Sequence, residues 1–313
     1  MSGSDWRPLA PLPALRQRAR LYQHIRAFFE ARDVMEVSTP VLGRHGVTDP
    51  AIQCIQVPGH GVLQSSPEYH MKRLLAAGSG AIYQISPVFR EGESGARHNT
   101  EFTLLEWYRP GFSLPRLIDE TCALMAPLLG QPPVKRVSFR ALFKAVTGLD
   151  PLSADMASLQ QAIPAGQHVP DMDRPQLVDW LMGFVVEPAM DRDTLVVVQD
   201  FPAWAAALAR LQTDPEGDTV AARFEIYFNG LELANGYDEL TDPAEQRARF
   251  EADRARRTAL GLPDASVDPH LLAALEHGIG DCAGVALGVE RLLMAASGEQ
   301  RIDRVMAFTR DNA

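Results

Sequence analysis

The stretch from Tyr83 to Pro110 constrains the fold of this chain more than any other part of the sequence. Two runs in which apolar and polar residues alternate flank a polar loop that contains glycine, a pattern typical of a long antiparallel β-hairpin. Because successive side chains of a strand point to opposite faces, the second run places four residues on one face: Phe102, Leu104, Glu106 and Tyr108.

The polar residues of this hairpin are suited to a nucleotide. Arg90 ends the first run, and Arg97, His98 and Asn99 close the loop. A guanidinium binds phosphate, an aromatic ring stacks on a base, and polar groups hold a small molecule. We therefore expect the hairpin to form part of a nucleotide site.

A second hairpin is predicted where Asn229-Gly230 separates the alternating runs Ala222–Phe228 and Leu231–Asn235. A two-residue turn makes Tyr227 oppose Glu232 and Glu225 oppose Ala234, so both carboxylates lie on one face. They either hold a cation between them or form a solvated pair, and spacing alone favours the solvated pair. This register places Asn235 on the opposite face, so a bulge or bend near Gly236 is needed to bring it to the same site.

Two predicted helix starts carry further candidates. Ser66 is the expected N-cap of a helix with Pro67 at its first position, and Gly78 ends that helix. Glu68 in its first turn either complements the helix dipole or binds a substrate ammonium. Near the C-terminus, a strand ends at Gly288 and a helix follows with Arg291 in its first turn, which is either an anion site or a surface charge.

The rest of the chain reads as one domain with a helical insertion at about 113–190. Residues 1–13, rich in proline, are expected to form a flexible arm, and 148–173 to be irregular. The other expected elements are helices at 14–32, 114–129, 139–146, 174–186 and 242–260, and strands at 34–42, 194–199 and 283–287.

Composition excludes several classes of protein. The chain has 313 residues and a formal net charge of −10, which disfavours broad attraction to nucleic acid. No apolar run approaches the roughly 20 residues that span a bilayer, so no membrane partner is expected. Cys54, Cys122 and Cys282 are widely spaced and odd in number, which argues against a disulfide framework. Without a signal peptide, we expect a cytoplasmic protein.

In one chain, these segments resemble the three motifs of a class II aminoacyl-tRNA synthetase. The first helix and the strand that ends at Pro40 resemble motif 1, Phe89 to Phe102 resembles motif 2, and Gly284 to Arg291 resembles motif 3. The runs RHNTEFTLLEWY and ELANGYDELTDPAEQ are similar to the catalytic domain of lysyl-tRNA synthetase. The resemblance implies an α+β fold, an antiparallel sheet flanked by helices, and a homodimer.

Two departures from the synthetases indicate a more specific family. Fewer than 20 residues precede the first helix, so we expect no anticodon-binding domain. Ala286 stands where synthetases have glycine in motif 3. With SPEYHMKRLL and LEWYRP, these features resemble the elongation factor P–(R)-β-lysine ligase family, lysyl-tRNA synthetase paralogs that attach β-lysine to a lysine side chain of elongation factor P.

The resemblance implies a role for each matching residue. Arg90 and Arg291 are the expected catalytic residues, which hold the phosphates of ATP, and Glu225 and Glu232 are the expected ligands of Mg²⁺. The amino acid, lysine or β-lysine, is expected to contact Ser66, Pro67, Glu68, Tyr108, Asn235, Glu239 and Ala286. ATP is expected to contact Arg90, Glu91, Gly92, His98, Asn99, Phe102, Glu232, Leu233, Gly288 and Arg291. Gly92 departs from the family pattern, because it occupies the place of the adenine-contacting glutamate of motif 2.

The chemistry implied is adenylation of the amino acid followed by acyl transfer to elongation factor P. Positioning and charge perform such a reaction without a protein nucleophile. Two alternatives remain: a minimal synthetase-like enzyme that acts on tRNA, which the acidic composition disfavours, and an inactive paralog that senses an amino acid. The presence of Arg90 and Arg291 argues against the inactive paralog, and only Gly92 argues for it.

Overall fold

The computed structural model describes residues 6–313, so residues 1–5 of the expected N-terminal arm lie outside the described residues. The chain divides into two compact units, which are described in turn. The first contains Met1–Ser113 and Leu240–Ala313, and the second contains Leu114–Glu239.

The first unit is built on four strands in the order β1 (Met35–Glu36), β5 (Ile82–Phe89), β6 (Glu101–Pro110) and β12 (Cys282–Gly288). The pairs β5–β6 and β6–β12 are antiparallel, and β1–β5 is parallel. A small sheet accompanies them, in the order β2 (Leu42–Gly43), β4 (Gly61–Leu63) and β3 (Gln56–Val57). The strand expected over 34–42 is thus confined to short β1 and β2 segments.

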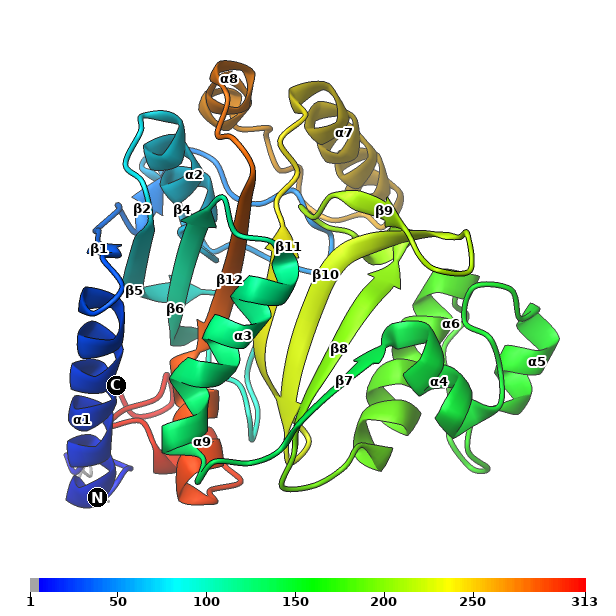
Figure 1. Ribbon diagram of the computed structural model, residues 1–313, viewed down its shortest axis with the longest axis horizontal. Helices are drawn as coiled ribbons and strands as arrows, with labels where there is room; N and C mark the ends of the chain where they lie inside the picture. The colour runs from blue at the N-terminus through cyan, green and yellow to red at the C-terminus, as the bar shows by residue number, and fades with distance from the viewer. Residues whose placement is uncertain (1–5) are drawn as a thin grey trace. The chain divides into compact units, whose positions relative to one another are not determined.

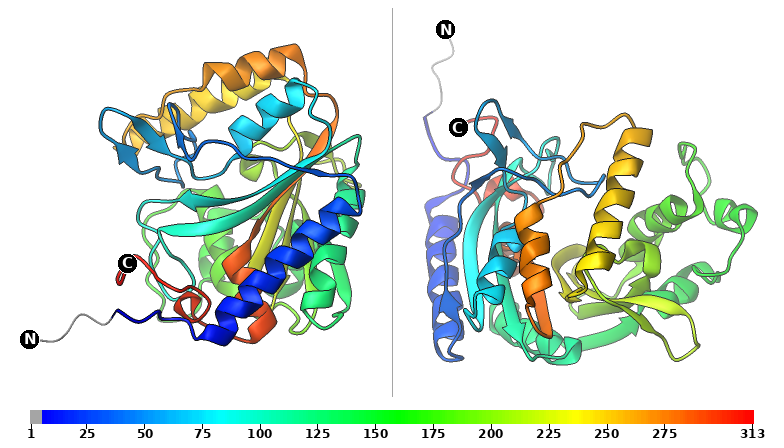
Figure 2. Two further views of the ribbon diagram at one scale, coloured as in Figure 1. Left: turned by 90° about the vertical axis from the view of Figure 1, so that its left-hand side faces the viewer. Right: turned by 90° about the horizontal axis from the view of Figure 1, so that it is seen from above.

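The predicted first hairpin is confirmed in its place and in the faces of its second strand. Gln84 pairs with Glu106 and Val88 with Phe102, so Glu106 and Phe102 share one face of β6. Phe29 of helix α1 (Leu12–Glu30) packs on the other face, with its ring 4.4 Å from Tyr83 and 5.4 Å from Trp107. Helix α1 therefore covers the face opposite Glu106, and it lies beside β5 and β6 in both views of Figure 2.

The remaining helices of this unit are α2 (Glu68–Ala76), α7 (Pro243–Ala259), α8 (Pro269–His277) and α9 (Val289–Ser297). Helices α2, α7 and α8 contact one another and lie together in Figure 2. Helix α7 lies within the expected range 242–260, and Asp242 caps it by accepting hydrogen bonds from the backbone N–H groups of Ala244 and Glu245. Helix α1 begins at Leu12, two residues inside the expected arm.

The second unit has an antiparallel sheet with one parallel pair. Its strands are in the order β11 (Leu231–Asp238), β10 (Thr219–Phe228), β8 (Leu195–Pro202) and β7 (Val134–Ser138), with β9 (Leu211–Thr213) also paired to β10. The pair β7–β8 is parallel.

The helices of the second unit are α3 (Leu114–Met125), α4 (Phe139–Thr147), α5 (Met156–Gln161) and α6 (Arg174–Leu181). Helices α4, α5 and α6 lie together beside β7 and β8 in Figure 1, and their apolar residues form one core with these strands. Two expectations were wrong: the supposedly irregular 148–173 contains α5, and the helix expected to Val186 ends at Leu181 and continues as a π-helical turn, Met182–Val186. Both units combine largely antiparallel sheets with separate helices, which confirms the α+β class.

Candidate active site

The centre of the site in the first unit is a buried carboxylate, Glu106. It pairs with Gln84 on one side and with Ala286 on the other, so these three residues form a row across β5, β6 and β12. Directly paired residues point to the same face of a sheet. The side chain of Ala286 therefore lies on the same face as that of Glu106 and next to it across the strand pair.

Two hydroxyl groups hold this carboxylate. Tyr108 donates to Oε1 at 2.7 Å, and Ser66 donates to Oε2 at 2.8 Å. Burial, followed by the nearby negative charge of Glu68, raises the pKa of Glu106 to about 7. The strand period predicts the face on which Glu106 lies, but no role for Glu106 was predicted. The signal was present, because a carboxylate among apolar residues on the inward face of a strand must be stabilised by partners.

Glu68 lies at the start of α2 beside a buried lysine. Its Oε1 accepts a hydrogen bond of 2.6 Å from Nζ of Lys72, whose side chain is only 1% exposed. The helix begins at Glu68, with Pro67 in the cap position, one residue later than expected. Ser66 still accepts a hydrogen bond from the backbone N–H of Glu68 at 3.0 Å, so its hydroxyl links the helix start to Glu106.

Arg90 ends β5 near the ring of Phe102. Its guanidinium carbon lies 5.1 Å from the centre of that ring, and Nη1 lies 3.4 Å from Oε1 of Glu93. Gly92 has a φ of +81°, in the left-handed region that favours glycine. No atom lies within 4 Å of an added Cβ, so the backbone conformation, and not lack of space, favours glycine here. The backbone N–H of Glu91 is held by the carbonyl of Gln53 at 2.8 Å.

Arg291 and His98 are in direct contact. Nη2 of Arg291 lies 2.8 Å from Nε2 of His98. Because a guanidinium only donates, Nε2 must accept, so this contact requires a neutral His98 with its proton on Nδ1. Gly288 lies beneath the Arg291 side chain, whose Cβ would be 3.6 Å from an added Cβ at the glycine.

The loop that carries His98 is tied to the C-terminal segment. The backbone N–H of Ile302 donates to the carbonyl of Ala96 at 2.8 Å, and that of Arg310 donates to Oδ1 of Asn99 at 3.2 Å. Nδ2 of Asn99 donates to the carbonyl of Glu101 at 2.6 Å. Both ends of the Asn99 amide therefore serve to shape the loop.

The hairpin of the second unit differs from the predicted register. Tyr227 opposes Glu232 as expected, but Glu225 opposes Asn235 rather than Ala234, because β11 has a bulge at Leu233. The extra residue reverses the alternation beyond it. Asn235 therefore shares the face of Glu225, and the prediction that it lies on the opposite face was wrong. The bulge that brings Asn235 to this face lies at Leu233, before Asn235 in the chain, and not near Gly236.

Glu225 is buried among polar partners. Arg223 donates to its Oε1 and Tyr227 donates to its Oε2. Nε of Arg223 also donates to Oδ1 of Asn235 at 3.2 Å, so one guanidinium joins the predicted metal ligand to the predicted substrate ligand. Burial raises the pKa of Glu225, Arg223 opposes this shift and the negative charge of Glu232 adds to it. Glu239, the last predicted ligand in this unit, is also buried.

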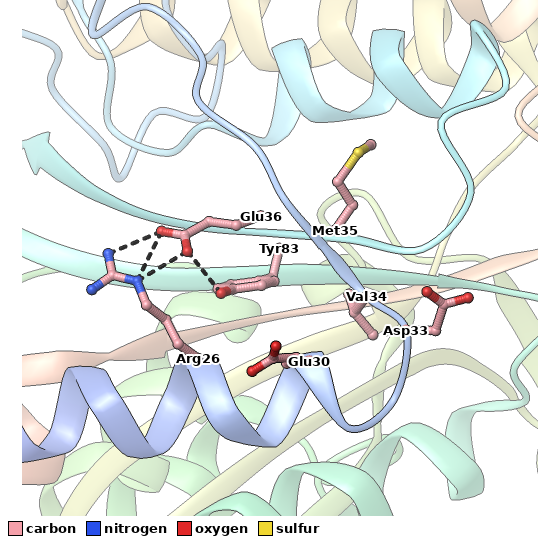
Figure 3. Close-up of a pocket in the computed structure, with 7 residues that line it drawn as sticks. All are labelled: Arg26, Glu30, Asp33, Val34, Met35, Glu36 and Tyr83. Carbon is pink, nitrogen blue, oxygen red and sulfur yellow. Dashed lines mark hydrogen bonds and ion pairs between the residues drawn. The ribbon is translucent and has the colours of Figure 1, made fainter.

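Neither a cluster of metal ligands nor a pocket marks the predicted site within residues 6–313. Within residues 6–313, no three His, Cys, Asp or Glu side chains form a group that could hold a metal by themselves. A hollow of about 370 Å³ lies between α1, β1 and β5, where Arg26 and Tyr83 both bind Glu36 (Figure 3). It contains none of the predicted site residues, so we do not assign the reaction to it.

No described helix has the length and apolarity needed to cross a membrane.

Comparisons with known proteins agree with the motifs. The family described as tRNA synthetases class II (D, K and N) matches residues 10–312. Proteins named elongation factor P–(R)-β-lysine ligase are similar over almost the whole chain. The one from Mannheimia succiniciproducens is 48% identical over 98% of both chains, and the one from Vibrio cholerae is 46% identical over 98% of both. That from Haemophilus influenzae is 46% identical over 99% of both. The chain therefore belongs to the class II tRNA synthetase family and, within it, to the family of elongation factor P–(R)-β-lysine ligases.

Proposed function

We propose that this protein activates (R)-β-lysine, or lysine, with ATP as an acyl-adenylate and transfers it to a lysine side chain of elongation factor P. The observation that carries this proposal is the identity of 46–48% over at least 98% of the chain with relatives that bear this name. The buried polar groups around Glu106 supply a physical reason for an amino-acid substrate.

The charges around Glu106 fit a substrate with an ammonium group. Glu68 and Glu106 carry two negative charges when ionised, and Lys72 compensates one of them. One negative charge is left over, and a buried charge is costly unless it is paired. In this proposal the substrate amine next to the carboxylate binds at Glu68 and Glu106, and Tyr108, whose hydroxyl holds Glu106, is a further substrate ligand. Ala286 beside Glu106 narrows the space and favours an amine on the β carbon.

The ATP site is proposed on the first hairpin. Phe102 stacks on the adenine, Arg90 binds the α-phosphate and the substrate carboxylate, and Arg291 binds the γ-phosphate. Arg90 already lies over the ring of Phe102, and His98 holds Arg291 by its Nη2. The family glutamate has no side-chain counterpart at Gly92, so we propose that backbone groups of Glu91 and Gly92 contact the adenine.

The carboxylates of Glu225 and Glu232 fit Mg²⁺. They share a strand face. The negative charge of Glu232 raises the pKa of Glu225, and a cation between the two carboxylates would relieve their repulsion. Although Arg223 and Tyr227 each engage one oxygen of Glu225, each oxygen keeps a second lone pair. Mg²⁺ commonly binds one or two carboxylates and completes its shell with water and phosphate oxygens. When bound, the ion would neutralise phosphate charge.

Adenylation joins the substrate carboxylate to the α-phosphorus of ATP and releases pyrophosphate. Acyl transfer then joins the acyl group to the ε-amine of the acceptor lysine and releases AMP. That amine must be neutral to attack, and at pH 7 only on the order of one lysine in a thousand is neutral. The protein's part in both steps is to position reactants and stabilise charge, and no residue needs to form a covalent bond with the substrate.

A homodimer is proposed from the segment that resembles motif 1. Met35 of β1, Val41 and Leu42 of β2 are large apolar side chains that are 51%, 36% and 40% exposed. Exposed apolar side chains are common in interfaces between protein chains. We also propose a cytoplasmic location, since Cys54, Cys122 and Cys282 are free thiols, the usual state in a reducing compartment.

The family resemblance to tRNA synthetases keeps tRNA as the second candidate acceptor. The test is ATP–pyrophosphate exchange with lysine and with (R)-β-lysine, followed by incubation of the activated product with elongation factor P or with tRNA. We expect exchange with both amino acids, more efficient with (R)-β-lysine, and a mass increase of elongation factor P. Robust charging of tRNA without modification of elongation factor P would refute the proposal.

A further inference from the structure

A second buried carboxylate, Glu290, lies next to Arg291 in the first turn of α9. Its side chain is 2% exposed. Oε1 accepts a hydrogen bond from Nη1 of Arg18 at 2.7 Å, and Oε2 accepts one from the backbone N–H of Thr103 at 2.9 Å. Glu290 therefore joins three elements that are distant in sequence: α1, β6 and α9.

Arg18 makes this junction with all three guanidinium nitrogens. In addition to the bond to Glu290, Nη2 donates to Oγ1 of Thr103 at 2.6 Å and Nε donates to the hydroxyl of Tyr22 at 3.0 Å. Burial alone would lower the pKa of Arg18, but Glu290 and Tyr22 raise it above its ordinary value. A rigid guanidinium fork is suited to this task, because it holds two acceptors at a fixed angle.

The junction lies directly behind residues proposed to bind ATP. Thr103 follows Phe102 on β6, and their side chains point to opposite faces of the strand. Glu290 precedes Arg291 in the same helical turn. The backbone pair between Leu104 and Gly288 also joins β6 to β12, just before α9 begins.

We propose that Arg18 is a positioning residue for nucleotide binding: by clamping Glu290 to Thr103, it fixes the spacing between Phe102 and Arg291. The inference rests on the proposed function, because that function places the adenine and the γ-phosphate at these two residues. Arg18 touches neither ATP nor the amino acid; it acts through its neighbours. Small misplacements of binding groups have large kinetic effects, so a distant clamp can control the affinity for ATP.

A clamp that only stabilises the fold is the competing explanation. Breaking such a clamp would lower the melting temperature and the fraction of active enzyme. It would leave the KM for ATP and the KM for the amino acid unchanged. A positioning clamp predicts a selective effect, because Glu106 is held by Tyr108 and Ser66, whereas Glu290 is held by Arg18 and Thr103.

The test compares four variants in ATP–pyrophosphate exchange: Arg18→Met, Arg18→Lys, Thr103→Val and Arg20→Met. Arg18→Met removes the clamp, and Arg18→Lys keeps its charge. Thr103→Val removes only the hydroxyl acceptor and leaves the backbone bond to Glu290. Arg20 is an exposed arginine of the same helix, so Arg20→Met is the control for loss of one positive charge.

We expect Arg18→Met to raise the KM for ATP about tenfold or more while the KM for the amino acid stays within about twofold, as loss of a charge-assisted clamp predicts. Arg18→Lys should recover part of this loss, Thr103→Val should show a smaller rise, and Arg20→Met should match the wild type. The double variant Arg18→Met, Thr103→Val should be no worse than Arg18→Met, since both remove the same contact.

Two results would overturn the inference. Unchanged KM values for ATP in the Arg18 and Thr103 variants, with lower melting temperature only, would assign the clamp to stability. If Arg18→Met fails to fold, Arg18→Lys and Thr103→Val decide by the same KM criterion. Absence of exchange in the wild-type enzyme would remove the proposed function and this inference together, whereas normal wild-type exchange with insensitive variants would remove this inference alone.

Discussion

Glu106 leads to a prediction about pH. The substrate ammonium needs an ionised carboxylate, but burial and Glu68 raise the pKa of Glu106 to about 7 in the free protein. The KM for the amino acid should therefore rise as the pH falls below 7. For folding the sign is the reverse: a carboxyl group whose pKa is raised in the folded state contributes stability that is fully present below its ordinary pKa of 4.5 and is lost as the pH rises through 7.

The magnitudes follow from the same pKa. With a pKa of about 7, roughly one molecule in eleven has an ionised Glu106 at pH 6 and roughly ten in eleven at pH 8. Because apparent affinity scales with the competent fraction, the KM for the amino acid should change by about tenfold between these values. The shift from 4.5 to about 7 corresponds to about 3 kcal/mol of stability lost as the pH rises from below 4.5 to above 7.

The assay is the KM for the amino acid in ATP–pyrophosphate exchange from pH 6 to 8, with the KM for ATP in the same buffers as the internal control. Glu106→Gln should bind the amino acid weakly at every pH and show no slope. Glu68→Gln should move the midpoint to lower pH, because the Glu68 charge raises the pKa of Glu106. Tyr108→Phe should move it to higher pH, because the tyrosine hydrogen bond lowers that pKa. A flat wild-type profile, or an equal slope in Glu106→Gln, would refute the reasoning.

Four further perturbations test the site, the backbone at Gly92 and the proposed dimer interface. Arg291→Ala should abolish pyrophosphate exchange and leave thermal unfolding by circular dichroism nearly unchanged; normal exchange would contradict its role at the γ-phosphate. Ala286→Gly should shift the ratio of kcat/KM values from (R)-β-lysine toward lysine, and an unchanged ratio would remove the methyl group as the selector. Gly92→Ala should lower the free energy of unfolding in urea by about 1 kcal/mol, because φ is +81° and no neighbour crowds the Cβ. Met35→Asp should convert a dimer into a monomer in size-exclusion chromatography with light scattering; a dimeric variant would place the interface elsewhere.

The first hairpin could be predicted because two strand-like runs flank a polar loop that contains glycine. Once Phe102 to Tyr108 are taken as a strand, their faces follow from its period of two, but the pairing with β5 does not. The cap of α7 was equally clear, because Asp242 and Pro243 are both strong start signals.

The second hairpin could be predicted only up to Leu233. The Asn229-Gly230 turn fixed the residue pairs next to it. The unpaired Leu233 reverses the faces of all later residues of β11, and residue types alone do not reveal such a bulge.

The burial of Lys72 could not be predicted from the sequence either. A lysine four residues after a glutamate is ordinarily a solvated helix pair, and only packing reveals that this one is buried.

The contacts between the loop that carries His98 and the C-terminal segment have a consequence for synthesis on the ribosome. Asn99 and Arg310 are 211 positions apart, and the carbonyl of Ala96 likewise waits for Ile302. Translation proceeds from the N-terminus at about 5–20 residues per second, so the loop emerges well before the residues that hold it. A nascent chain therefore has Arg90 and the first hairpin before this loop is held in place. With ATP bound as proposed, full affinity for ATP should arise only after Arg310 has left the exit tunnel.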